Sequence, residues 1–200
     1  MIVDARVFGL GAPPGTPERT LEHEALHIAI GQRGETLHDL RDRSDDPASA
    51  YGITLEVAGT ACEEFRVERT LWGIHTAPSP ISQLADFEST LRRFDAIVSG
   101  ASQRYQQDHD VERIMGSVGA AFNAIATATG YVAAEIDATD EARLPQVEID
   151  LARRLLGGVW VDLVRALREL PPADVAAALV DLDAQAHEVA RCVEVNCRAL

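Results

Sequence analysis

The sequence contains no lysine, because all 18 basic residues are arginine. A lysine Schiff base, a phosphate-binding P-loop lysine and a lysine general base are therefore excluded. The sequence also lacks any run of basic residues, and its formal net charge at pH 7 is −14. Nucleic acids and anionic membrane surfaces are bound through clusters of positive charge, so the charge pattern argues against both as partners.

Cysteine is also scarce. The three cysteines have neither a zinc-ribbon spacing nor a C-x-x-C spacing. The first six residues, Met1 to Arg6, lack the basic-then-apolar order of a signal peptide. These features predict a cytoplasmic protein with reduced thiols. The uncharged segment Met115–Ala134 is rich in small residues and too weakly apolar to span a membrane, so we expect a tightly packed helix there.

One short motif is typical of a metal-binding catalytic site. It is the H-E-x-x-H pattern from His23 to His27, with Glu24 at its second position. Residues four apart lie on one face of a helix, so the two imidazoles can bind the same metal ion. The Glu24 carboxylate lies one residue further round, where it can accept a proton from a water molecule at that ion. This is the pattern of zinc hydrolases, and it predicts a zinc site with Glu24 as general base.

A long helix is expected around this motif. Thr16-Pro17-Glu18 is typical of a helix start with Thr16 as N-cap. The helix is expected to continue to about Arg43 unless Gly31 or Gly34 breaks it. In a continuous helix His38 would lie about 16 Å beyond His27, so a shared metal ion would require a break at Gly34.

A catalytic zinc ion needs a third protein ligand and an open position for water. The candidates occur in a second helix, predicted from about Thr60 to Gly73. Glu64 and Glu68 are four residues apart on one face of this helix. Glu63 can instead reach back to the Thr60 amide in a capping box. We therefore expect Glu64 to bind the metal, with Glu63 as the alternative.

The run from Glu63 to Glu68 resembles the E-D-x-R-[IV]-E pattern of metallopeptidase segments in the gluzincin-like group, with Glu64 in place of the usual Asp. The resemblance covers this run and the H-E-x-x-H motif, and it does not extend to the C-terminal half. It implies a glutamate ligand from the downstream helix and a hydrogen bond from a zinc-binding histidine to Glu68. His75 continues the Glu64 face and is a candidate oxyanion stabiliser, or else a structural histidine at the helix end.

The rest of the chain has a helical pattern. Apolar residues recur at spacings of three and four in four further segments: Ile81–Val98, Val111–Ile125, Val147 to just before Pro171, and Val175–Val193. Only residues 1–10 alternate like a strand. We therefore predict a mainly α fold with little strand and one domain, 1–200. Residues 1–77 form its zincin-like, metal-binding half, and residues 78–200 form a bundle of amphipathic helices.

The leading interpretation is a zinc-dependent hydrolase, specifically a metallopeptidase acting on a peptide or protein. An acidic all-helical interaction protein without catalysis is the first alternative, because a gluzincin normally lines its cleft with a sheet. A ferritin-like di-metal bundle is the second, with Glu24–His27 as one E-x-x-H unit. That site needs a second such unit, and the nearest candidate, Asp183–His187, is one residue too long. The pattern specifies neither a substrate nor an oligomeric state.

Overall fold

The computed structural model describes residues 15–47, 49–75, 83–138 and 159–197. Its regular elements are helices, with no strand in these ranges, so the predicted mainly α fold is confirmed. The helices are α1 (Thr16–Gln32), α2 (Ala50–Ile74), α3 (Gln83–Asp108), α4 (Val111–Ala138), α6 (Val159–Arg168) and α7 (Leu179–Cys197). The expected strand at residues 1–10 and most of the helix expected from Val147 lie outside the described residues.

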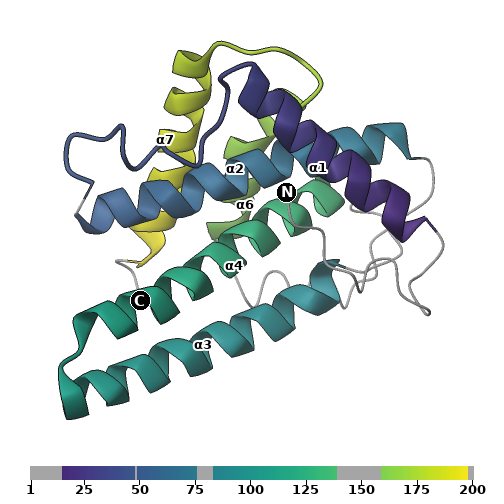
Figure 1. The fold of residues 1–200 in the computed structure, drawn as a ribbon. Helices are drawn as coiled ribbons and strands as arrows, with labels where there is room; N and C mark the ends of the chain where they lie inside the picture. The colour runs from purple at the N-terminus through teal and green to yellow at the C-terminus, as the bar shows by residue number, and fades with distance from the viewer. Residues whose placement is uncertain (1–14, 48, 76–82, 139–158, 198–200) are drawn as a thin grey trace.

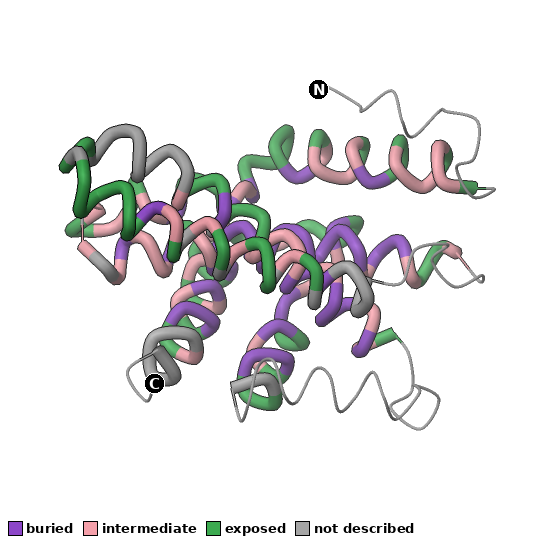
Figure 2. Tube along the Cα trace, turned by 90° about the horizontal axis from the view of Figure 1, so that it is seen from below, coloured by how far each residue is buried: buried purple, intermediate pink, exposed green. Residues whose placement is uncertain are grey.

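Helix α2 is the central element of the fold. It packs against α1, α4 and α7, while α3 forms a hairpin with α4 and α6 packs on α7 (Figure 1). From Ala58 to Leu71 every residue of α2 except Arg69 is buried. Figure 2 shows the buried segments of the helices in purple. A helix buried on all sides needs neighbours on all sides, and these three helices provide them. One core cluster accordingly contains residues of both halves of the chain, including Leu55, Val132 and Leu182.

Helix α2 is longer than its sequence pattern predicted. It begins at Ala50, and its N-cap is Ser49, whose hydroxyl accepts a hydrogen bond from the Gly52 amide at 3.0 Å. Thr60 therefore lies inside the helix, and the predicted capping box between Thr60 and Glu63 is wrong. The amide of a residue within a helix is already bonded to the preceding turn, so Glu63 has no free amide to reach there.

Helix α1 is shorter than predicted. Gly15, not Thr16, is its N-cap, and the helix ends at Gln32 rather than near Arg43. Gly34 has φ +69°, a left-handed conformation that glycine adopts without steric cost, and the chain reverses there. The returning loop buries Leu37 against α2, where a Cβ at Gly59 would lie only 2.2 Å from the Leu37 carbonyl oxygen.

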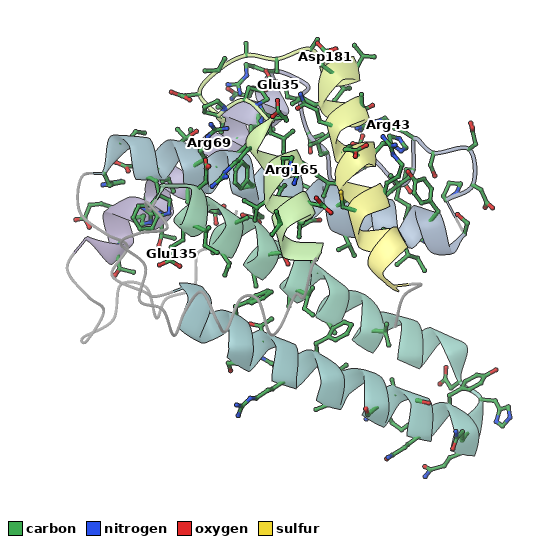
Figure 3. All side chains as sticks on the ribbon, turned by 180° about the vertical axis from the view of Figure 1, so that it is seen from behind. Glu35, Arg43, Arg69, Glu135, Arg165 and Asp181 are labelled. Carbon is green, nitrogen blue, oxygen red and sulfur yellow. The ribbon has the colours of Figure 1, made fainter. Side chains whose placement is uncertain are left out.

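The loop between α6 and α7 is hydrogen-bonded to α2 through Arg66. The fully buried Arg66 guanidinium donates to the carbonyl oxygen of Pro171 at 3.0 Å and to Glu35 at 2.8 Å. Glu35 lies beside this loop (Figure 3) and accepts a hydrogen bond from the Ala177 amide at 3.2 Å. Helix α7 therefore begins at Leu179, later than the Val175 expected from the apolar spacing. Within the described ranges, no helix is long and apolar enough to cross a membrane.

Candidate metal centre

Helix α1 lies across α2 (Figure 1). Two histidines and three glutamates meet between these helices. His23 and His27 come from α1. Glu63, Glu64 and Glu68 come from α2, and all three glutamates are buried. These five residues are referred to below as the His–Glu cluster. His23 and His27 are four residues apart, as are Glu64 and Glu68, so each helix presents these side chains on the face that meets the other helix.

Three atoms of the cluster form a nearly equilateral triangle. The Nε2 atoms of His23 and His27 are 3.1 Å apart. Each of them lies 3.3 Å from Oε2 of Glu64. Tetrahedral zinc has Zn–N and Zn–O distances of about 2.0–2.2 Å, which separate neighbouring ligand atoms by about 3.3–3.5 Å. The three atoms thus have close to the spacing of three zinc ligands, and the group could hold a metal ion.

A carboxylate orients each imidazole. His23 Nδ1 lies 3.0 Å from Oε1 of Glu68, and His27 Nδ1 lies 2.9 Å from Oε1 of Glu63. A carboxylate acceptor at Nδ1 favours the tautomer with its proton there, which leaves the Nε2 lone pair free. Both lone pairs then point at the same space beside Glu64. This is how a metal-binding histidine is normally held in place.

The two orienting carboxylates are themselves fixed by the surrounding chain. The second oxygen of Glu68 accepts a hydrogen bond from Arg19 at 2.5 Å, and the Arg19 guanidinium lies over the Trp72 ring. The second oxygen of Glu63 accepts hydrogen bonds from the Leu37 amide at 3.0 Å and from the Thr36 hydroxyl at 3.2 Å. Both oxygens of Glu63 and both oxygens of Glu68 are therefore engaged in holding the site together.

The two candidate glutamates belong to two different groups that could hold a metal ion, Glu64 with His23 and His27, and Glu63 with His27 and His38. Glu64 Oε2 faces both Nε2 atoms, whereas Glu63 contacts His27 through Nδ1, on the opposite side of that ring. Glu63 therefore contacts Nδ1 of His27 in the same way as Glu68 contacts Nδ1 of His23. The sequence pattern did not reveal this role of Glu63, because its other partners belong to the loop after α1, which was expected to be helical.

The charges of the cluster strongly perturb its titration. Burial alone would lower the pKa of His23, but hydrogen bonds and charges from Glu64 and Glu68 outweigh it and raise the pKa to about 9. Burial acts in the same way on His27, where Glu63 and Glu64 raise the pKa to about 10. Burial would raise the pKa of Glu64, yet its hydrogen bonds to the two histidines lower it.

The same charges favour a cation at this place. With neutral imidazoles, the three carboxylates and the Arg19 guanidinium leave two net negative charges in a largely buried position. Buried charge of one sign is costly unless it is neutralised. Protons on the imidazoles can offset it, and so can one divalent cation.

The cluster opens into a cleft of about 530 Å³ that is accessible to solvent. The cleft is lined by His23, Glu24, His27, Ile28, Thr36, His38, Glu63, Glu64 and Tyr131. Within the described part of the chain, the Glu24 carboxylate has no hydrogen bond or ion pair. Glu24 therefore shares the cleft with the two imidazoles and is free to accept a proton there.

Two residues reach the site from parts of the chain that the motifs did not indicate. His38 lies on the loop after the early end of α1, and its Nε2 atom is 3.1 Å from Oε1 of Glu63. Its ring stacks on His27 with centroids 6.2 Å apart. Tyr131 comes from α4, and its hydroxyl lies 3.2 Å from Nε2 of His23. The early end of α1 is the break that the sequence required for His38 to approach His27, whereas no local spacing in the sequence predicts Tyr131.

Other candidates are not brought to the cluster. His75 follows the last residue of α2, where its imidazole contacts Glu22, and it does not line the cleft. It lies eleven residues beyond Glu64, which is about 16 Å along a helix, so the structure does not support it as an oxyanion stabiliser. Asp183 and His187 of α7 contact Arg43 and Tyr51 instead, and they supply no second metal-binding unit.

Comparison of the chain with family models, with curated proteins and with solved structures finds no match.

Proposed function

We propose that this protein is a zinc-dependent hydrolase in which His23, His27 and Glu64 bind the metal ion. The observation that carries the proposal is the triangle of two Nε2 atoms and one carboxylate oxygen, with sides of 3.1, 3.3 and 3.3 Å. Two imidazoles and a carboxylate form a ligand set used by catalytic zinc sites, which leave one position open for water or substrate. Imidazole ligands also favour zinc over magnesium or calcium.

The surroundings of the triangle support a catalytic site over a purely structural one. A structural zinc site is closed by four protein ligands, whereas this triangle borders an open cleft. The cleft also contains Glu24, a carboxylate outside the triangle. An open face and a free base beside the metal ligands are the parts that hydrolysis requires.

The proposed mechanism divides the chemistry between the metal and the chain. A bound zinc ion supplies a Lewis acid that polarises a carbonyl group and lowers the pKa of water to about 7. Glu24 accepts the proton of the attacking water on its carboxylate and passes it to the leaving nitrogen. Glu68 and Glu63 keep the two imidazoles in the orientation in which Nε2 faces the metal.

The resemblance to gluzincin-like metallopeptidases favours an amide bond in a peptide or protein as the target. It covers the motif residues His23–His27 and the run Glu63–Glu68, and in gluzincins these positions supply the ligands and the base. No strand borders the cleft in the described ranges, which differs from the sheet that gluzincins use to bind a substrate backbone. We therefore propose that helices and loops form the substrate-binding walls of this protein.

The test combines metal analysis with one substitution. Protein purified without a histidine tag should contain one zinc ion per chain, and the His23→Ala, His27→Ala double variant should contain none. Glu24→Gln should retain zinc but lower the rate of peptide cleavage by about 10²–10⁴-fold, since it removes only the base. Cleavage would be followed by mass spectrometry on a broad peptide library.

Glu22→Gln is the matched control, because Glu22 lies on the same helix but does not line the cleft. It should leave both zinc content and cleavage unchanged. Two outcomes would overturn the proposal: wild-type protein that takes up no zinc, or zinc-loaded wild type and Glu24→Gln that behave alike across the library. The acidic helical interaction protein would then be the better description.

A further inference from the structure

A second set of candidate metal ligands lies on the other side of the His27 ring. It consists of His27, His38 and Glu63, whose ligand atoms all lie within 4.8 Å of one another. Oε1 of Glu63 is 2.9 Å from Nδ1 of His27 and 3.1 Å from Nε2 of His38. The triangle with Glu64 uses the other nitrogen of His27, Nε2. His27 therefore presents one nitrogen to each group.

The carboxylate of Glu63 is held with one oxygen turned toward this second group. Its Oε2 atom accepts hydrogen bonds from the Leu37 amide at 3.0 Å and from the Thr36 hydroxyl at 3.2 Å, while Oε1 faces the two imidazoles. Glu63 is also buried. A carboxylate that is anchored through one oxygen is oriented before a metal ion arrives, as ligating carboxylates usually are.

His38 completes the group from the loop after α1. Its side chain is half exposed and lines the same cleft as His27 and Glu63, so a metal ion can reach this position from solvent. Ligand atoms around a tetrahedral zinc ion are about 3.3–3.5 Å apart. A half-exposed side chain on a loop can move to meet that distance more easily than a buried side chain on a helix.

The charges that line the cleft match two divalent ions. The three glutamates of the His–Glu cluster and Glu24 carry four negative charges, and Arg19 carries one positive charge. One zinc ion therefore leaves one net negative charge. A second ion that replaces the Nδ1 proton of His27 adds one net positive charge, and the site becomes neutral. Neutralisation removes the cost of burying charge of one sign.

We propose that a second divalent transition-metal ion binds to Nε2 of His38, Oε1 of Glu63 and Nδ1 of His27. It takes the place of the Nδ1 proton of His27, which leaves to solvent through the cleft, and the His27 ring then bridges the two ions. Imidazole ligands favour zinc and similar transition metals over magnesium or calcium. The inference rests on the proposed zinc site for its first ion, but not on catalysis.

The second site is the weaker of the two. The first ion repels the second, and His38 is more exposed than either histidine of the first site. Protein as purified should therefore contain one ion, and the second should bind only when metal is added beyond one equivalent.

The test uses His38→Gln, which removes a ligand of the second ion and none of the first. His75→Gln is the matched control, because it makes the same change on a histidine that contacts Glu22 and does not line the cleft. Circular dichroism would establish that both variants fold. The probe is cobalt(II) in equilibrium dialysis, with excess magnesium to occupy unselective acidic sites. Wild type and His75→Gln should bind two cobalt ions, whereas His38→Gln should retain the first and bind the second more than about 100-fold more weakly.

Proton NMR of the cobalt-loaded protein reports directly on His27. The N–H protons of imidazoles bound to cobalt(II) give strongly shifted signals that vanish in D2O. After one equivalent, His23 and His27 should each give one such signal, because the carboxylates at their Nδ1 atoms favour a proton there. The second ion should remove the His27 signal in wild type, whereas His38→Gln should keep both signals in excess cobalt.

The outcomes separate this inference from the zinc site on which it rests. If wild type binds one cobalt ion and no second, the second site is refuted and the first stands. The same conclusion follows if His38→Gln binds the second ion as tightly as wild type. If the second ion binds while both N–H signals persist, His27 does not bridge the ions and the proposal is overturned. If wild type binds no metal, both proposals fall together.

Discussion

At the scale of single residues, the adjacent glutamates Glu63 and Glu64 have different tasks. Glu64 faces Nε2 of both imidazoles. The carboxylate of Glu63 is hydrogen-bonded to His27 Nδ1 and to the loop residues Thr36 and Leu37. We therefore predict that Glu64→Gln weakens zinc binding by more than about 100-fold. Glu63→Gln, like Glu68→Gln, should cost about 10–100-fold, the usual effect of losing a residue that orients a ligand.

Competition titrations against a chromophoric zinc chelator would measure these affinities. Glu63→Gln and Glu64→Gln serve as controls for each other, since they make the same chemical change on neighbouring residues of one helix. The ligand assignment would be reversed if Glu63→Gln lost the metal while Glu64→Gln kept it.

A second prediction at this scale concerns protons. The pKa values of about 9 for His23 and about 10 for His27 lie above the unfolded value of 6.5. The metal-free fold therefore gains stability from these protons below about pH 6.5 and loses it as the pH rises through 9 to 10. Zinc requires neutral imidazoles, so its binding at pH 7 should release at least one proton per chain, and its apparent affinity should increase from pH 6 to pH 8.

A pH-indicator dye in weakly buffered solution would detect the released protons as zinc is added. The His23→Ala, His27→Ala double variant provides the baseline. Zinc uptake by wild type without proton release would mean that the imidazoles are already neutral at pH 7.

At the scale of elements, the close contact between α2 and α4 depends on Gly130. Replacing it with alanine would force a Cβ into the α2 backbone at 2.6 Å, and we predict a loss of about 1–3 kcal/mol in the free energy of unfolding. Gly119→Ala on the same helix is the control. A Cβ there meets nothing within 4 Å, so its effect should be neutral or a gain of up to about 1 kcal/mol from helix propensity.

Urea denaturation of the two variants would measure both changes in the free energy of unfolding. Because the displaced contact includes Glu64, Gly130→Ala should also weaken zinc binding, whereas Gly119→Ala should not. Equal stabilities of the two variants would show that α4 can move away from α2 without cost.

At the scale of the whole molecule, an ion-pair network centred on the buried Glu35 and Arg66 joins the loop after α1 to α2 and to the loop between α6 and α7. Glu35 accepts hydrogen bonds from Arg33 and Arg66, while Arg33 donates to the Ala173 carbonyl oxygen at 2.6 Å. Arg66 is completely buried, so Glu35→Ala would leave its charge without a counterion. We predict destabilisation by about 3–5 kcal/mol. Glu56→Ala, which breaks the half-exposed pair with Arg41, should cost less than about 1 kcal/mol.

Thermal and urea unfolding of both variants would test this difference. Burial would raise the pKa of Glu35, but hydrogen bonds from Arg33, Arg66 and the Ala177 amide lower it to about 2. Its contribution should therefore persist down to about pH 4.5 and disappear as the pH falls toward 2. The difference in the free energy of unfolding between wild type and Glu35→Ala should disappear in that range. A difference that is unchanged at pH 2 would contradict the lowered pKa of Glu35.

The sequence by itself determined the features that depend on local spacing. Apolar periodicity predicted the helical class, and the four-residue spacing of His23 and His27 placed both imidazoles on one face of α1, because a helix repeats every 3.6 residues. The same rule placed Glu64 and Glu68 on one face of α2. Local rules were less successful at helix ends, since the reversal at Gly34 and the early start of α2 are stabilised by burial of Leu37 and Leu55 in the core.

Only the tertiary structure decided how these faces meet. The distinct tasks of Glu63 and Glu64 follow from the packing of α1 and its loop on α2, and that packing also brings in His38. Tyr131 is more than 100 positions from His23 and reaches it because Gly130 lets α4 approach α2. His75 shares a face with Glu64 but lies too far along the helix to join it. Periodicity gives the direction of a side chain around its own helix, whereas the residues that it contacts are set by how the helices pack.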